Sequence, residues 1–514
     1  MVIMKFQSLP LIFLVFCYLQ IAFVVPDVIQ AQPLKLTTLY TLDSNSAGDQ
    51  FGYCVSGAGD VNADGFADLI VGAHNDNENG PGVGSARVYS GVDGTILYTF
   101  YGETAYNYFG VSVSGAGDVN ADGFADVIVG AYLNDNNGTY SGNAQIFSGI
   151  DGTVLYTFNG DSEFDRFGLV VSEAGDVNSD GFADVIVGAD LDDNTGVNSG
   201  SARVFSGIDG ALLYTFNGDG PFDYFGRSVN TAGDVNDDGV NDLIVGAPGD
   251  NSARVFSGID GSILYDFSGV FSPDLFGGSV SGAGDVNGDG YDDVIVGAYE
   301  HTSIDIGMAR VFSGADGSLL YSFEGDDPFD RLGNSVSGAG DINKDGFDDL
   351  LVGISSDDNN GPESGTTRIY SGADGTILYD VEGDSAIDFF GKSLSEAGDV
   401  NGDGVKDLIV GGLGVGSVRV FCLTLLDFRR GDVSGDGVFN LADPIRGLNI
   451  IIGTASNLCA DASDANDDGL VDISDAVYLL STLFQDAPLP PDPGLQCGTD
   501  PTEDDLGCET PNCP

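Results

Sequence analysis

The hydrophobic and polar positions of this chain repeat as short apolar segments between polar, glycine-rich turns. In residues 109 to 158, apolar positions alternate over 109 to 114 and run continuously over 127 to 131. They return over 144 to 148 and 153 to 158, on either side of Asp151-Gly152. Alternation and short apolar runs bounded by turn residues are typical of β-strands. This unit therefore predicts four strands, the last two joined by a tight hairpin.

The same pattern returns along residues 34 to 423, and no stretch of that region has helical periodicity. Between the first two strands of each unit lies a nine-residue phrase, Asp-x-Asn-x-Asp-Gly-x-x-Asp. The phrase starts at Asp60, Asp118, Asp176, Asp234, Asp285, Asp341 and Asp399. Units of this size cannot bury an apolar face alone, so they stack on their neighbours. Seven units of four antiparallel strands predict an all-β fold, a seven-bladed β-propeller.

The two ends of the repeat region predict how the ring closes. The seventh unit has its second strand at 408 to 410 and its third at 418 to 421, but no fourth strand follows. A matching strand, Thr38 to Leu42, precedes the first unit. We expect this N-terminal strand to complete the last blade, because closure removes two exposed sheet edges.

Two cysteines fall at this closure. Cys54 stands where other units have Ser112 or Ser228, and Cys422 stands where they have Ser148 or Ser206. One hypothesis is a disulfide that joins the first and last blades. The alternative is two separate small thiols, because a disulfide requires Cα atoms within about 7 Å.

The residues around each acidic phrase resemble a known repeat. Phe276-Gly277, the phrase from Asp285 to Asp293, and Val296-Gly297-Ala298 are similar to the FG-GAP repeat of integrin α-subunit propellers. Unit six departs from it with Leu332, and unit seven with Gly412. The resemblance implies a propeller that takes part in interaction or adhesion. Some FG-GAP-like propellers bind sugars between blades, which makes a carbohydrate-binding lectin an alternative.

Each phrase supplies oxygen atoms at alternate positions: the side chains at positions one, three, five and nine, and the backbone carbonyl at position seven. Glycine at position six permits the sharp turn around an ion. Ca²⁺ accepts such an oxygen shell, whereas Mg²⁺ demands stricter octahedral geometry, so Ca²⁺ is the expected ion. The predicted ligands are Asp60, Asn62, Asp64, Phe66, Asp68, Asp118, Asn120, Asp122, Phe124, Asp126, Asp176, Asn178, Asp180, Phe182, Asp184, Asp234, Asn236, Asp238, Val240, Asp242, Asp285, Asn287, Asp289, Tyr291, Asp293, Asp341, Asn343, Asp345, Phe347, Asp349, Asp399, Asn401, Asp403, Val405 and Asp407. Equivalent places in every blade favour a structural role over direct contact of one Ca²⁺ with a ligand.

A different calcium pattern follows residue 430. Two twelve-residue loops, each followed by apolar residues at helical spacing, resemble the dockerin type I module. Their predicted ligands are Asp432, Ser434, Asp436, Val438, Asn440, Asp443, Asp464, Asn466, Asp468, Leu470, Asp472 and Asp475. The resemblance implies helices that follow their loops and a cohesin-like partner. Pro444 and Gly447 depart from the family, so a calcium-folded intramolecular cap is the alternative.

The net charge and the N-terminal sequence limit the expected partners and location of the protein. The chain has 80 acidic and 17 basic residues, a net charge of −63, which argues against nucleic acid or an anionic membrane surface as a partner. Residues 1–31 read as a signal peptide cleaved after Ala31, with an uncleaved anchor as the alternative. The expected protein is secreted or at the cell surface, with no membrane insertion after signal removal.

The predicted organisation is a signal peptide at 1–31, a propeller at 34–423, a linker at 424–430, a dockerin-like module at 431–486 and a Pro/Cys-rich tail at 487–514. Cys459, Cys497, Cys508 and Cys513 are expected to form disulfides in an exported protein, with the pairing open.

No nucleophile–base constellation is visible, and the two histidines, His74 and His301, are expected in solvated loops. We therefore predict an exported calcium-binding interaction or adhesion protein and not an enzyme. Its partner would be an extracellular protein or a glycan, bound through the variable loops at 75–84, 133–142, 191–200, 302–307 and 355–365. Besides the lectin, a component of a polysaccharide-degrading complex, catalytic or not, is a further alternative.

Overall fold

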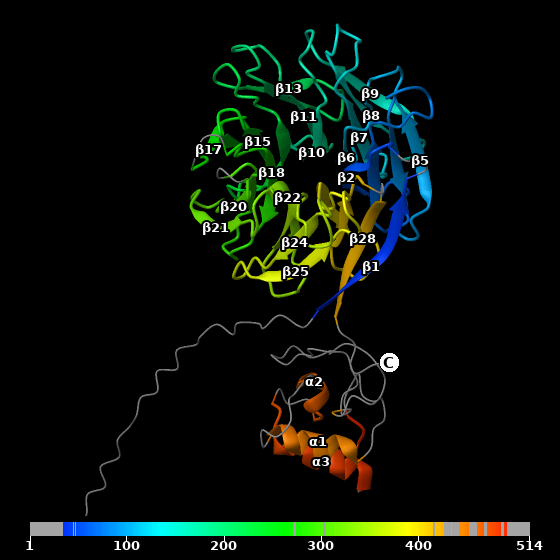
Figure 1. The fold of residues 1–514 in the computed structure, drawn as a ribbon, viewed down its shortest axis with the longest axis vertical. Coiled ribbons are helices and arrows are strands. Elements are labelled where there is room, and N and C mark those ends of the chain that lie inside the picture. Colours follow the sequence, from blue (N-terminus) through cyan, green and yellow to red (C-terminus); the bar gives the residue numbers. More distant parts are fainter. Residues whose placement is uncertain are drawn as a thin grey trace, which may run out of the picture.

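Seven four-stranded antiparallel sheets surround one axis in the computed structural model of the protein (Figure 1). The structure describes residues 34–44, 46, 48–270, 274–301, 305–414, 417–425, 433, 441–451, 460–466, 470–484 and 488–490. The predicted signal peptide, most of the predicted linker and almost all of the predicted tail with its cysteines lie outside these residues, as does Cys459. The seven-bladed propeller is confirmed, and no helix occurs in the described part of residues 34–423.

Each blade runs from an inner strand at the axis to an outer strand at the rim. The inner strands are β2 (Phe51–Gly59), β6 (Ser112–Gly117), β10 (Val170–Gly175), β14 (Ser228–Gly233), β18 (Ser279–Gly284), β22 (Leu332–Gly340) and β26 (Ser393–Gly398). The second strands are β3 (Asp68–Ala73), β7 (Asp126–Ala131), β11 (Asp184–Ala189), β15 (Asp242–Ala247), β19 (Asp293–Ala298), β23 (Asp349–Ile354) and β27 (Asp407–Gly411). The second strands are the most apolar, because neighbouring blades cover both of their faces.

Most third strands carry an arginine, and every outer strand carries a half-buried tyrosine. The third strands are β4 (Ser85–Tyr89), β8 (Asn143–Phe147), β12 (Ser201–Phe205), β16 (Ser252–Phe256), β20 (Met308–Phe312), β24 (Thr366–Tyr370) and β28 (Ser417–Leu425). The outer strands are β5 (Ile96–Tyr101), β9 (Val154–Asn159), β13 (Leu212–Asn217), β17 (Ile263–Ser268), β21 (Leu319–Glu324), β25 (Ile377–Glu382) and, in blade 7, β1 (Leu34–Asp43).

Aromatic rings hold neighbouring blades together at the rim. Phe100 on the outer strand of blade 1 stacks on Phe147 of blade 2, with ring centroids 4.1 Å apart. Blades 2 to 6 continue this stack at spacings between 3.8 and 4.2 Å. Tyr98 adds a hydrogen bond from its hydroxyl to the Gly149 carbonyl of the next blade, 2.8 Å long. Such pairs bury large apolar areas and fix the angle between blades.

The Phe-Gly turns fix the approach of neighbouring blades near the axis. Phe109 is fully buried, and Gly110 has a φ of +82°, in the left-handed region. A Cβ on Gly110 would lie 2.2 Å from the Ser85 carbonyl oxygen of the preceding blade, and one on Gly72 would lie 2.1 Å from the Gly110 carbonyl oxygen. Glycine is therefore required on both sides of this contact by space as well as by backbone conformation.

The N-terminal strand closes the ring as predicted. β1 pairs antiparallel with β28 from Leu34↔Leu425 to Asp43↔Ser417. Tyr40 on β1 donates a hydrogen bond to the Gly91 carbonyl of blade 1, 2.9 Å long, as outer-strand tyrosines do elsewhere. Leu42 packs in one apolar cluster with Tyr89 of blade 1, the place where other blades have stacked rings. β1 thus forms the outer strand of blade 7 and also makes the contact between blade 7 and blade 1.

The proposed disulfide between the first and last blades is wrong. Cys54 and Cys422 are both free thiols. The Cys54 thiol faces blade 2, where its Sγ accepts a 3.3 Å hydrogen bond from the Val113 N–H. Cys422 is buried on the third strand of blade 7, opposite Thr37 of β1. The two cysteines therefore serve different contacts. Cys54 stands in the place of Ser112, whose Oγ accepts the equivalent bond from the Val171 N–H of the next blade.

Three helices are described beyond the propeller: α1 (Ala442–Ile451), α2 (Ala460–Ser463) and α3 (Ile473–Phe484). Helices α1 and α3 contact each other, and Val433, Ala465 and Leu479 form a small apolar cluster. α1 and α3 fall where the sequence predicts helices after the loops. The short α2, directly before the second loop, is an addition that helical spacing did not indicate. None of the described helices combines the length and the apolar character needed to cross a membrane.

We expect a chain that begins at Ser44, and so lacks β1, to lose ring closure. β28 would then present an unpaired edge to solvent, which favours self-association. The melting temperature should fall by more than about 10 °C, since the truncation removes a whole strand and its apolar contacts. Calorimetry and size-exclusion chromatography measure both effects.

A synthetic peptide of residues 34–43 should restore the melting temperature in trans, whereas the same peptide with Tyr40→Phe and Leu42→Ser should restore less. A monomeric truncated chain with an unchanged melting temperature would contradict this account of closure.

Candidate functional site

The seven acidic phrases form equivalent loops between the inner and second strands, all at one face of the propeller. In the first loop the Asp60 carboxylate accepts hydrogen bonds from the N–H groups of Asp64 (3.0 Å) and Gly65 (2.9 Å). The Asp64 carboxylate accepts one from Phe66 (3.0 Å). The fourth residue, Ala63, is left-handed with a φ of +55°. These bonds draw the chain into a tight turn that gathers the oxygens of positions one, three and five.

The ninth aspartate of each loop turns away from the others and into the blade. Asp68 is fully buried, and its oxygens accept hydrogen bonds from the N–H groups of Val61 (2.8 Å) and Gly91 (2.9 Å). The ninth residues of all seven loops are fully buried: Asp68, Asp126, Asp184, Asp242, Asp293, Asp349 and Asp407. In blades 1 to 6 this carboxylate therefore ties the acidic loop to the turn between the third and outer strands of its own blade. In blade 7, Asp407 instead accepts from the Val400 N–H and the Asn401 side-chain amide.

The donor chemistry of the loops fits a hard cation. Asn120 Oδ1 and Asn236 Oδ1 at position three and Asp349 Oδ2 at position nine are buried without a hydrogen-bond partner. A buried oxygen of this kind is costly unless something satisfies it. Among the described residues, no three acidic, histidine or cysteine side chains converge tightly enough to hold a metal ion by themselves. The amide oxygen at position three and the carbonyl at position seven are thus needed to complete the shell, and the full ligand sets stay predictions.

Burial changes the acidity of the ninth aspartates. Desolvation raises the pKa of Asp68 to about 6, of Asp293 to about 7 and of Asp349 to about 8, against two backbone hydrogen bonds that lower each pKa. The carboxylates at positions one and five of the same loop raise these pKa values further. A bound divalent cation would favour the ionised carboxylate and so relieve this repulsion.

Removal of divalent cations should destabilise the propeller. We expect excess EGTA to lower the melting temperature by at least about 10 °C, because each site occupied well above its dissociation constant contributes about 2.7 kcal/mol. Differential scanning calorimetry measures the change. Added Ca²⁺ should restore the original melting curve, and equimolar Mg²⁺ should restore less of it. An unchanged curve in EGTA would rule out a structural calcium role.

The same carboxylates predict a pH dependence in EGTA. Their folded-state pKa values of about 6 to 8 lie above the ordinary aspartate value of about 3.9, so the folded state binds protons more tightly. This contribution to stability is fully present below about pH 4 and is lost as pH rises through the folded pKa values. The melting temperature in EGTA should therefore fall between pH 5 and pH 8.

The measurement needs about 0.5 M salt to screen repulsion from the high net charge. With millimolar Ca²⁺ the fall should disappear, because the cation stabilises the ionised form. Equal slopes with and without Ca²⁺ would show that the ninth aspartates do not respond to the ion.

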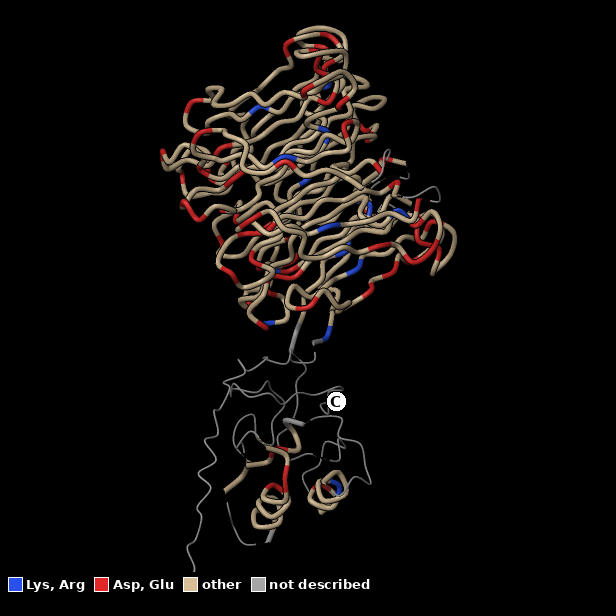
Figure 2. Tube along the Cα trace, turned by 90° about the vertical axis from the view of Figure 1, so that its left-hand side faces the viewer, with Lys and Arg blue, Asp and Glu red and all other residues tan. Residues whose placement is uncertain are grey.

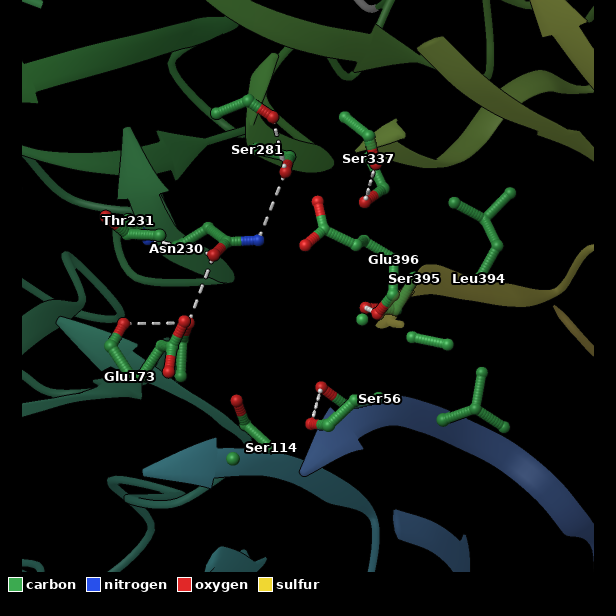
Figure 3. Close-up of a pocket in the computed structure, with 18 of the residues that line it drawn as sticks. Ser56, Ser114, Glu173, Asn230, Thr231, Ser281, Ser337, Leu394, Ser395 and Glu396 are labelled. Carbon is green, nitrogen blue, oxygen red and sulfur yellow. Dashed lines mark hydrogen bonds between the residues drawn. The ribbon is translucent and has the colours of Figure 1, made fainter. Parts of the chain in front are cut away.

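A channel of about 610 Å³ runs along the propeller axis between the inner strands (Figure 3). Serines of the inner strands line part of it, and several of their hydroxyls donate to the carbonyl of the next residue, such as Ser56 to Gly57 (2.9 Å). Glu173 and Glu396 project into it. Lys406 pairs with Glu396 at 2.8 Å. The Glu173 carboxylate is open to the channel but enclosed by the seven inner strands, and this desolvation, followed by the charge of Glu396, raises its pKa.

The two histidines differ from the expectation of solvated loops. His301 is buried, and its Nδ1 lies 3.2 Å from an Asp274 carboxylate oxygen. The ring of His74 packs between Tyr53 and Tyr108, with centroids 4.1 and 5.6 Å away. Burial lowers the pKa of His74 to about 4. Both follow the second strand, at the face opposite the acidic loops, and each contacts a turn that leads into an inner strand.

In the C-terminal module the described ligand candidates are Asp443, Asp464, Asn466, Leu470, Asp472 and Asp475. Asp443, Asp464 and Asp475 are buried. Asp475 Oδ2 accepts a 2.8 Å hydrogen bond from the Asp472 N–H. Predicted ligands Asp432, Ser434, Asp436, Val438, Asn440 and Asp468 lie outside the described residues.

Comparison with known proteins agrees with the fold. Six segments match the FG-GAP repeat, at residues 51–89, 109–147, 172–205, 225–263, 276–314 and 332–370, one in each of blades 1 to 6. Similar proteins include integrin alpha-5 of Xenopus laevis, 32% identical over 220 residues, or 38% of this chain and 21% of that protein. Integrin alpha-V of Gallus gallus is 32% identical over 225 residues, again 38% of this chain and 21% of that protein.

Integrin alpha-2 of Bos taurus is 36% identical over 172 residues, or 30% of this chain and 14% of that protein. The chain thus spans about a fifth or less of the length of these relatives. The fold and the matched repeats together define an integrin-α-like, seven-bladed β-propeller.

Proposed function

We propose that this chain is an exported, calcium-stabilised interaction protein whose propeller binds an extracellular protein in an adhesion-type role. The observation that carries the proposal is a difference between the two faces of the propeller. One face holds seven equivalent acidic loops. The other holds the variable loops between second and third strands and the turns that lead into each inner strand. Repetition suits a scaffold, and variation on a fixed scaffold suits recognition.

Exposed aromatic side chains gather on the variable face. Among the described residues, the strongly exposed aromatics are Tyr106, Tyr140, Phe164, Phe222 and Phe329. All five lie in the variable loops or in the turns beside them, and all have positive φ. The Phe164 N–H donates to the Thr139 carbonyl (2.8 Å), and the Phe222 N–H to the Val197 carbonyl (2.8 Å), which joins each turn to a variable loop. Aromatics held this way are typical anchors of protein interfaces.

Calcium in this proposal is a structural cofactor of about seven propeller sites and two sites in the C-terminal module. The C-terminal module would anchor or assemble the protein, with a cohesin-like domain as its partner if the dockerin resemblance extends to function. The similarity to integrin α-chains supports the adhesion-type role and a location outside the cell or at its surface. It also supports a non-enzymatic protein.

The test is capture of partners from the native extracellular fraction in millimolar Ca²⁺. We expect the full chain and a chain ending at residue 423 to capture the same protein through the propeller. The double variant Phe222→Ser/Phe329→Ser should reduce capture at least about tenfold, since each buried aromatic anchor contributes about 1 to 2 kcal/mol or more. Quantitative mass spectrometry of the captured material measures this.

The matched control is Ile208→Ser/Ile259→Ser, which removes two similarly exposed apolar side chains from the acidic-loop face. It should leave capture unchanged, and both double variants should keep the wild-type melting temperature. Equal loss with both pairs would show that the variable face is not the binding face. A glycan array that retains the propeller while no protein is captured would favour a lectin instead.

A further inference from the structure

Four cationic side chains occur together in the turns that lead into the inner strands. Arg166 and Arg331 directly precede the buried Phe167 and Leu332, and Arg227 and Lys392 lie just before the inner strands β14 and β26. We call Arg166, Arg227, Arg331 and Lys392 the cationic mouth. They lie at the variable face, where the inner strands that line the axial channel begin, and none of the four lines the channel itself. Figure 2 shows how sparse basic residues are among the acidic ones elsewhere in the propeller.

These charges act on one another across the axis. Burial lowers the pKa of the Lys392 ammonium, and the positive charges of Arg227 and Arg331 lower it further. Arg227 also acts on Tyr53 of blade 1 and on Tyr299 of blade 5. Residues of blades 1, 4, 5, 6 and 7 therefore lie close enough at the variable face for these charges to act on them.

Acidic partners for this region are few, although the chain is strongly acidic. Arg227 Nη1 lies 3.3 Å from Asp190 Oδ2. The charge of Arg166 also acts on Asp190, and Glu300 acts on Tyr299 in the same region. Within the described residues, Arg166, Arg331 and Lys392 have no carboxylate within 4 Å. In contrast, the third-strand arginine Arg368 pairs with Asp380 (2.7 Å) and Asp326 (2.8 Å). The mouth thus keeps positive charge that this chain does not neutralise.

An apolar cavity adjoins the mouth at Arg166. It has a volume of about 350 Å³ and is lined by Tyr132, Leu133, Tyr140, Phe164, Arg166 and Leu191. The guanidinium of Arg166 lies 5.9 Å from the Tyr132 ring centroid, so one side chain belongs to both features. A cationic point beside an apolar cavity can receive a carboxylate and a neighbouring apolar side chain of one ligand.

We propose that the cationic mouth binds a carboxylate presented by a loop of a partner protein, and that the cavity beside Arg166 takes an apolar or aromatic side chain next to that carboxylate. This deepens and rests on the proposed function, since it names the chemistry that the variable face recognises. A point-like site at the centre of a ring of loops suits the tip of a protein loop, whereas an acidic polysaccharide chain suits an extended groove. The −63 net charge repels acidic surfaces in general, so a carboxylate is retained only where it reaches the mouth.

Immobilised poly-L-glutamate and a random copolymer of glutamate and tyrosine are suitable probes for the full chain in millimolar Ca²⁺. We expect binding to both by biolayer interferometry, with the copolymer tighter because tyrosine fills the cavity. Lys392→Gln and Arg331→Gln should each weaken binding at least about tenfold, since each removes a charge-assisted contact. Arg331 is exposed, so Arg331→Gln should fold even if Lys392→Gln does not. The melting temperature of each variant shows whether it is folded.

The matched control is Lys344→Gln, the same change of charge at an exposed residue of an acidic loop on the opposite face. It should leave binding unchanged. Wild-type binding by folded Arg331→Gln and Lys392→Gln, or no binding of either polymer, would overturn the proposal. Mouth-dependent binding of hyaluronan, without binding of the glutamate polymers, would overturn it in favour of an acidic glycan.

Failure of this inference is distinguishable from failure of the proposed function. If the wild-type chain captures a protein partner and the two mouth variants capture it equally, the proposed function stands and the inference fails. If the mouth binds the polymers but no protein is captured from the extracellular fraction, the mouth chemistry stands and the proposed function fails.

Discussion

The structure depends on contacts between neighbouring blades, repeated at seven seams around a closed ring. No blade buries its own apolar faces, so each second strand needs a neighbour on both sides. Stacked rings and tyrosine hydroxyl bonds fix the rim, and the close approach of Gly72 and Gly110 fixes the blades near the axis. The ring is closed only if blades 7 and 1 make the same kinds of contact as the other neighbouring blades. β1 makes it, with Tyr40 in the place of Tyr98.

Because the ring fixes the backbone, charge can be concentrated at its faces. In blades 1 to 5 the ninth aspartate accepts hydrogen bonds from two backbone N–H groups and so holds its loop against the blade. The carboxylates at positions one and five are mostly exposed or half-buried, and a bound cation would offset their repulsion. The loops would thereby combine two roles: their innermost carboxylate is part of the fold, and their outer oxygens would bind the ion. Cations bound in this way would explain why so acidic a chain can fold with so few basic residues.

The sequence was sufficient for the blades, the ring closure and the acidic loops, because these follow from local alternation, fixed spacing and turn chemistry. Contacts between blades were harder to predict. The hypothesis of a Cys54–Cys422 bond failed because position in a repeat does not tell which neighbour a side chain faces. His301 was expected in solvent, but it is buried beside Asp274 for the same reason. The inward turn of Asp68 was also missed, since a ligand pattern alone does not distinguish an oxygen that faces an ion from one that faces backbone N–H groups. The meeting of Arg227, Arg331 and Lys392 required the ring itself.

The balance of positive and negative side chains differs between the two faces of the propeller. At the acidic-loop end, carboxylates outnumber cations, and Lys406 is paired with Glu396. At the variable end, cations remain although acidic residues are plentiful in the chain. An unpaired, half-buried lysine costs stability, so a neutral side chain at position 392 would give a more stable propeller. A charged group that lowers the stability of the fold is typical of recognition surfaces, because its partner belongs to another molecule. Recognition in this propeller is therefore best sought where its repeats differ in charge as well as in length.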